Sequence, residues 1–170
     1  MSKISRMMVV ALVAVGFSSA ASAQLAKNFD QRRLFFGGGV SSNSADGTDN
    51  HPTGFQLFGG YNFGEFAPKF QLDAEVGYMD SGKFKVNNPL GGGSVSGSAK
   101  GLWATGLVRY MVAPQWELIG RLGYDFGDDD GLMFGVGAGY ILNPHWKLRG
   151  EYVVRDNINS LQFNVVWYPW

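Results

Sequence analysis

Residues 144–152 read PHWKLRGEY, and this stretch decides the fold because its apolar and charged side chains alternate. In an extended strand the tryptophan, leucine, glycine and tyrosine would share one face, and the charged residues the other. The same order of proline, aromatic residue, polar residue and leucine recurs in PKFQLDAEVGY (68–78) and PQWELIGRLGY (114–124). A period of two residues predicts strands with one apolar and one polar face.

Each of these segments follows another alternating run across a short turn that contains proline, which predicts antiparallel hairpins. Extending the pattern in both directions gives eight strands, most of roughly ten residues, the length that a tilted transmembrane strand needs. They are expected near Arg33–Val40, Gly54–Phe63, Lys69–Met79, Lys100–Val112, Gln115–Asp125, Leu132–Leu142, His145–Arg155 and Ser160–Tyr168. The links after the odd-numbered strands are polar loops: Ser41–Thr53, Asp80–Ala99, Phe126–Gly131 and Asp156–Asn159. The predicted fold is all-β, an eight-stranded antiparallel up-and-down transmembrane β-barrel.

The apolar faces have the character of a membrane-facing surface. Aromatic residues recur near the strand ends and small or aliphatic residues in between, as in Phe70 to Tyr78 and Trp116 to Tyr124. A water-soluble barrel or sandwich with an apolar interior is the alternative, and the opposite faces argue against it.

The polar faces carry five acidic and five basic residues. They are Asp73, Glu75, Arg109, Glu117, Arg121, Asp125, Lys147, Arg149, Glu151 and Arg155. An eight-stranded barrel has little room inside beyond its own side chains, and buried charges must be paired. We therefore predict a plugged lumen held by ion pairs, in which the glycines at 101, 123, 135, 137 and 139 relieve crowding.

The N-terminus has the features of an export signal. Lys3 and Arg6 precede an uninterrupted apolar run, Met7–Phe17, and small residues end in Ala21-Ser22-Ala23. We predict a cleavable signal peptide over residues 1–23 and an outer-membrane β-barrel domain over residues 24–170. The mature chain would carry 12 basic and 14 acidic residues, a net charge of −2.

Composition excludes several classes of protein. The 170 residues contain no cysteine, which rules out a disulfide scaffold, a thiolate metal site and a cysteine nucleophile. A formal net charge of zero argues against a nucleic-acid partner. Gly37-Gly38-Gly39 lacks the lysine and helix of a phosphate-binding loop, so no cofactor is predicted.

From about Arg33 to Trp170 the chain resembles the outer-membrane β-barrel family that includes the OmpA-like transmembrane domain and the OmpX-like small barrels. The resemblance rests on GVGAGYILNPHWKLRGEY (135–152) and on the C-terminal run LQFNVVWYPW (161–170). It implies a location in the bacterial outer membrane, contact with membrane lipid and lipopolysaccharide, and a monomer that acts as a structural or surface-interaction protein without catalysis. Its loops could also bind an extracellular ligand.

The family also ends in an alternating strand with a terminal aromatic residue that the barrel-assembly machinery reads. The matching candidates are Phe163, Val165, Trp167 and Trp170. Pro169 departs from that pattern, and Trp170 has the opposite parity to the other three, which predicts a bulge or a frayed end.

Two alternatives to a structural or surface-interaction role remain open in the sequence. His51, Asp80 and Ser81 on one rim resemble the arrangement in barrel enzymes that acylate or deacylate lipid A, where histidine would activate serine or a substrate hydroxyl. A narrow porin is the other alternative. The carboxylates of Asp128-Asp129-Asp130 lack the spacing of an EF-hand, and we interpret them as a solvated turn that divalent ions could bridge to lipopolysaccharide phosphates.

Overall fold

The structure is a computed structural model that describes residues 29–45, 50–87, 94–128 and 130–170. The predicted signal peptide, residues 1–23, lies outside the described residues, so its cleavage stays a prediction. The chain divides into two units, residues 1–31 and 32–170, and the second holds all the strands. In the described part of the chain, no helix has the length and apolarity that crossing a membrane would require.

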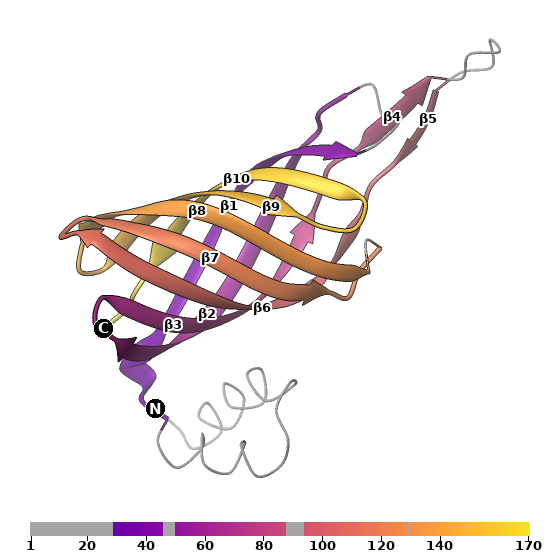
Figure 1. Ribbon diagram of the computed structural model, residues 1–170. Coiled ribbons are helices and arrows are strands. Elements are labelled where there is room, and N and C mark those ends of the chain that lie inside the picture. The colour runs from indigo at the N-terminus through magenta and orange to yellow at the C-terminus, as the bar shows by residue number, and fades with distance from the viewer. Residues whose placement is uncertain (1–28, 46–49, 88–93, 129) are drawn as a thin grey trace. The chain divides into compact units, whose positions relative to one another are not determined.

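Eight strands close into one antiparallel barrel, as predicted (Figure 1). Around the barrel the order is β1, β10, β9, β8, β7, β6, β3 and β2, so each strand pairs with its neighbours in the sequence of barrel strands. The ring closes between the first and last strands, from Phe36 opposite Trp167 to Ala45 opposite Ile158. The bounds are β1 Leu34–Ala45, β2 Thr53–Ala67, β3 Phe70–Asp80, β6 Lys100–Ala113, β7 Trp116–Asp125, β8 Gly131–Asn143, β9 Trp146–Val154 and β10 Ile158–Trp167.

The first strand is longer than predicted: it continues to Ala45 instead of ending at Val40. The extension is polar, and its side chains at Ser41 and Asn43 point inward and are buried. Asn43 Nδ2 donates to Ser41 Oγ at 3.0 Å and to the Ser81 carbonyl at 2.8 Å. A strand can therefore continue through residues of low apolarity because the lumen, not the membrane, receives their side chains.

A second, two-stranded sheet was not predicted. It consists of β4, Phe84–Asn87, and β5, Ser94–Gly97, within the segment that the sequence indicated as a loop. Figure 1 shows this hairpin continuing beyond the end of β3 and β6. Two hydrogen bonds clamp its base: Ser81 N donates to the Ala99 carbonyl and Ala99 N to Ser81 Oγ, each at 2.8 Å.

The outer face of the barrel is apolar, with aromatic rings concentrated toward both ends. At the end where β1 begins, Trp146 stacks on Trp167 with ring centroids 6.2 Å apart, and Trp116 lies 4.9 Å from Tyr140. At the other end Phe55 lies 6.4 Å from Tyr78, and Tyr124 5.1 Å from Phe126. Exposed leucines and valines occupy the outer face of the strands, among them Leu57, Leu72, Val108, Leu122, Val136, Leu148 and Val165. This surface is suited to hydrocarbon, and a soluble barrel with an apolar interior is excluded.

Glycines on the inner face make room for the side chains opposite them. A Cβ atom at Gly137 would lie 2.6 Å from Glu151 Cγ and would also overlap the Gly150 carbonyl oxygen. On the outer face, by contrast, a Cβ atom at Gly120 would meet nothing within 4 Å.

The substitution Gly137→Ala should lower the free energy of unfolding by about 1–3 kcal/mol, because the added methyl group overpacks the lumen. Gly120→Ala is the matched control and should leave stability unchanged or slightly raised, since alanine is less flexible than glycine in the unfolded chain. Urea titration of the folded protein in vesicles, followed by tryptophan fluorescence, measures both. Equal stability of the two variants would contradict the assignment of Gly137 to a crowded interior.

Candidate functional site

The barrel interior is the part of the molecule where charged side chains gather. The turn end is the end with the two-residue turns at 68–69, 114–115 and 144–145, and the loop end is the opposite one. The structure places all ten charged residues of the polar faces on the inner side of the wall. Nine of them are buried, and Lys147, nearest the turn end, keeps 12% of its side chain exposed.

The first layer of ion pairs lies toward the turn end and joins β3, β6, β7 and β9. Arg109 sits between two carboxylates: its Nη1 donates to Glu117 Oε2 at 2.9 Å and its Nη2 to Asp73 Oδ1 at 3.0 Å. Lys147 Nζ lies 3.2 Å from the same oxygen of Glu117. Asn62 and Gln71 complete the layer, with Asn62 Nδ2 donating to Asp73 Oδ1 at 2.6 Å and Arg109 Nη2 to Gln71 Oε1 at 2.8 Å.

The second layer is a closed ring of four charges in the middle of the barrel. Glu75 accepts from Arg149 Nη1 at 2.6 Å and from Arg121 Nη2 at 3.1 Å. Glu151 closes the ring, 3.0 Å from Arg121 Nη2 and 3.3 Å from Arg149 Nε. All four residues are at most 4% exposed. The ring spans the lumen because its members come from β3, β7 and β9, no two of which are adjacent in the barrel.

The third layer lies toward the loop end. Asp125 Oδ2 accepts from Arg155 Nε at 3.0 Å. Arg155 Nη1 donates to Ser160 Oγ at 3.0 Å, and Ser160 in turn donates to Asn43 Oδ1 at 2.6 Å. The charges of this layer are thereby tied to β10 and β1 and, through Asn43 and Ser81, to the base of the β4–β5 hairpin.

Each layer is separately neutral. Two acids face two bases in the first layer, two face two in the second, and one faces one in the third. Low-dielectric surroundings make an unpaired charge very costly, so neutrality over the whole lumen would not be enough if opposite charges lay in different layers. The five acidic and five basic residues of the lumen therefore balance within each layer, and not only in total.

Two further components of the interior did not emerge from the charged residues of the sequence. An apolar cluster that includes Met79, Trp103, Met133 and Val153 packs among the inner side chains, and Arg121 lies 5.2 Å from the Trp103 ring centroid. An amide group joins β2 to β10: Gln56 Nε2 donates to Gln162 Oε1 at 2.9 Å and to Asn164 Oδ1 at 2.7 Å. Strand parity was the signal that could have found them, since they occupy the inward positions of β2, β3, β6, β8, β9 and β10.

The three rim residues considered for catalysis are not arranged as a catalytic group. Ser81 is fully buried, and its hydroxyl accepts from Ala99 N at 2.8 Å and donates to the Gly82 carbonyl at 3.2 Å. Asp80 pairs with Lys100 at 2.8 Å and caps Gly82 N at 3.0 Å. His51 is exposed, and no hydrogen bond in the described part of the chain joins it to either residue.

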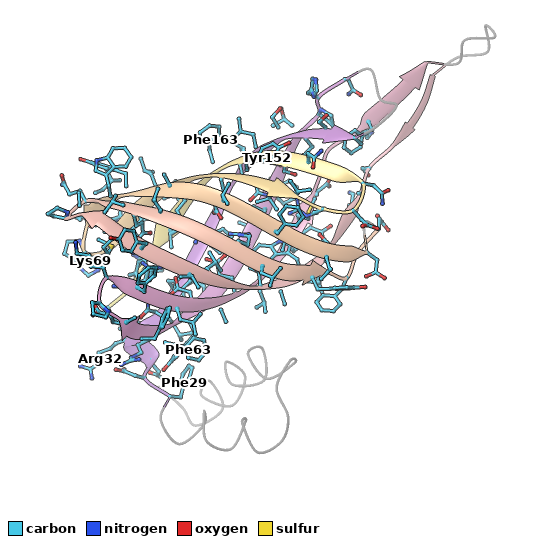
Figure 2. The ribbon with its side chains drawn as sticks, viewed as in Figure 1. Phe29, Arg32, Phe63, Lys69, Tyr152 and Phe163 are labelled. Carbon is cyan, nitrogen blue, oxygen red and sulfur yellow. The ribbon has the colours of Figure 1, made fainter. Side chains whose placement is uncertain are left out.

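The remaining candidates lie on the surface. In residues 29–45, 50–87, 94–128 and 130–170, no three acidic or histidine side chains converge as a metal site would require. Asp129 is outside the described residues. Phe163, Val165 and Trp167 point outward from β10, whereas Trp170 follows the end of the strand and is exposed. Figure 2 shows Phe163 and Tyr152 on the outer surface of the barrel.

The sequence matches the model of the outer membrane protein beta-barrel domain over residues 9–167. The chain belongs to this family. A comparison with curated protein sequences finds no significant match.

Solved structures share the same architecture. Ail of Yersinia pestis in a phospholipid bilayer nanodisc is 15% identical with a TM-score of 0.55, over 79% of this chain and 97% of that one. Ail in complex with the heparin analogue sucrose octasulfate is 17% identical with a TM-score of 0.50, over 79% and 95%. A de novo designed transmembrane β-barrel is 23% identical with a TM-score of 0.52, over 79% and 92%. At these identities the likeness shows the fold.

Local neutrality of the layers can be tested by a pair of double variants. Glu75→Gln alone leaves excess positive charge in the second layer and should destabilise the barrel by about 3–5 kcal/mol. Adding Arg121→Met restores neutrality within that layer, so the matched double variant should cost less than the sum of its two single variants. Adding Arg109→Met instead restores only the total charge, and this mismatched double variant should cost about the full sum.

Urea unfolding of all five variants in vesicles measures these free energies. Equal coupling in the matched and mismatched doubles would show that only the total charge of the lumen matters.

Proposed function

We propose that this protein is a non-catalytic barrel of the bacterial outer membrane that anchors a surface for interaction. In this proposal the turn end and both termini face the periplasm and the loop end faces outward. The three neutral layers of ion pairs carry the proposal, because they fill the lumen and hold the wall rigid beneath the loops. Membership of the outer-membrane barrel family and the two aromatic belts support the location.

Export and insertion would follow the family's usual route. The apolar segment before residue 24 would direct secretion and be removed, and the outward residues of β10 would be read by the barrel-assembly machinery. Closure of the ring between β1 and β10 leaves no open sheet edge in the membrane, so the folded barrel would act as a monomer surrounded by lipid.

The loop end supplies the candidate interaction surface. The β4–β5 hairpin extends it. In the sequence, the links between strands at this end are mainly acidic: they carry Asp46, Asp49, Asp128, Asp129, Asp130 and Asp156 against Lys83 and Lys85. Asp80 and Lys100 pair with each other, and so do the buried Asp125 and Arg155. Ail binds the polyanion sucrose octasulfate, but this excess of acids favours a cationic partner, or lipopolysaccharide phosphates bridged by divalent ions, at the surface of this chain.

A lipid-modifying enzyme is a weaker proposal. Such an enzyme needs an accessible nucleophile and a pocket for an acyl chain. The Ser81 hydroxyl is buried in the base of the hairpin, and charged side chains occupy the lumen where the acyl chain would lie.

The filled lumen makes a direct electrical prediction. Protein inserted in a planar bilayer should give no large, steady conductance, because the ring of Glu75, Arg121, Arg149 and Glu151 crosses the lumen. A porin from the same membrane, recorded in the same bilayer, is the positive control. Steady channels of the barrel protein would support the narrow-porin alternative instead.

Absence of catalysis predicts unchanged lipid A. Mass spectrometry of lipid A from cells that express the protein should give the same acylation pattern as cells without it. A His51→Ala variant provides the control for indirect effects of expression. A gain or loss of an acyl chain that depends on His51 would overturn the non-catalytic proposal.

A further inference from the structure

A recess of about 240 Å³ opens at the turn end of the barrel. Four cationic side chains line it, together with the amides of Asn62 and Gln71. The cations are Arg32, Arg33, Arg109 and Lys147. No carboxylate is part of this lining, which distinguishes the recess from the neutral layers further inside the lumen.

The charges of the recess have two origins. Arg109 and Lys147 form its floor, and Asp73 and Glu117 neutralise them from the lumen side. Arg33 is different: it is exposed, and in the described part of the chain no carboxylate forms an ion pair with it. At Arg33 the lining of the recess therefore departs from the local neutrality that the interior maintains.

A bulge in β2 holds Arg33 at this mouth. The ladder between β2 and β3 passes from Asn62 opposite Asp73 to Gly64 opposite Leu72 and so skips Phe63. The carbonyl of Phe63 accepts a hydrogen bond from Arg33 Nη1 at 2.8 Å. Gly64 adopts a φ of +92°, and its ideal Cβ position is only 3.3 Å from Arg33 Nη1. A bulge that re-aims a side chain is a common device beside binding sites.

Figure 2 shows Arg32 and Phe63 together at this end of the barrel, with Lys69 in the neighbouring turn between β2 and β3. The other wall is ordered by the segment after β10. Tyr168 N donates to the His145 carbonyl at 2.8 Å, and Lys147 Nζ lies 4.9 Å from the Tyr168 ring centroid. Hydrogen bonds within the chain thus hold Arg33 on one side of the recess and Tyr168 on the other.

We propose that this recess binds a phosphate group. A guanidinium held by one hydrogen bond keeps its remaining N–H groups for the forked contact that phosphate oxygens accept, and the amides of Asn62 and Gln71 add neutral donors. The turn-end aromatic belt, with Trp146 stacked on Trp167, sets this mouth at the depth of lipid headgroups. The phosphate group could belong to an anionic phospholipid headgroup of the periplasmic leaflet or to free phosphate. Only the choice of leaflet rests on the orientation given under the proposed function.

The test uses the exported chain, folded in alkyl maltoside micelles, which contain no phosphate of their own. Inorganic phosphate is titrated in one arm, and short-chain phosphatidylglycerol is added to the micelles in the other. Amide resonances of Arg33, Asn62, Phe63 and Tyr168 should shift and saturate. Saturation with both probes assigns recognition to the phosphate group itself, and saturation with phosphatidylglycerol alone assigns it to the lipid headgroup.

Three variants distinguish binding at the recess from a general effect of positive charge on the protein. Arg33→Gln should weaken binding roughly tenfold or more, because a charge-assisted contact is lost. Arg33→Lys, which keeps the charge without the fork, should fall between this variant and the unmodified chain. Lys83→Gln removes one positive charge at the loop end and should leave binding unchanged.

A heat-modifiable band on electrophoresis checks that each variant is folded. Saturation by neither probe would overturn the proposal. So would equal shifts with chloride at matched ionic strength, or equal affinity of Arg33→Gln and Lys83→Gln.

Discussion

The cost of burying charge is the constraint on which the rest of this structure depends. A barrel of eight strands encloses a lumen too narrow for bulk water, so each inward carboxylate needs a base within hydrogen-bonding distance. The chain meets this demand layer by layer, as the ring of Glu75, Arg121, Arg149 and Glu151 shows. Residues in one layer come from strands far apart in sequence, so the ion pairs also specify which strands face each other across the barrel. A one-residue slip of β9 would turn Arg149 and Glu151 toward lipid, where a charge is expensive.

The outer face obeys the opposite rule with the same strands. Hydrocarbon offers no partner to a backbone N–H or carbonyl group, so the sheet must close, and pairing of β1 with β10 leaves no edge. Leucine, valine and aromatic residues outside are compatible with lipid but distinguish poorly between alternative registers, because lipid tails are as apolar as the side chains themselves. The register of the strands is therefore specified by the interior. The ion pairs and the amides of Gln56, Gln162 and Asn164 contribute, and so do glycines such as Gly137, where any side chain would overlap Glu151.

The sequence predicted those parts of the fold that depend on a period of two residues. The eight strands and the inward set from Asp73 to Arg155 follow from alternation alone, because parity assigns each side chain to a face. Alternation does not reveal how far neighbouring strands are offset along the barrel axis. That offset decides that Arg109 meets Asp73 and Glu117, whereas Arg121 meets Glu75 and Glu151. The polar end of β1 and the β4–β5 hairpin were missed for another reason. Serine, glycine and asparagine have weak strand propensity, and their strands depend on contacts such as those of Asn43 and Ser81 that no local pattern encodes.

Likeness to a designed barrel shows how little the architecture says about function. That barrel and Ail match this chain with similar TM-scores, although one was designed and the other evolved. What the shared physics demands is an apolar exterior, a closed ladder and an interior whose charges are paired, and the layers of this lumen supply the last of these. Features that stability does not demand are better evidence of selection for a task. The bulge that skips Phe63 gives up ladder pairing of β2 with β3, and it leaves Arg33 without a carboxylate at the barrel mouth among the described residues. A chain that pairs every charge in its interior yet holds this guanidinium in place at the mouth has kept it for a partner outside the barrel.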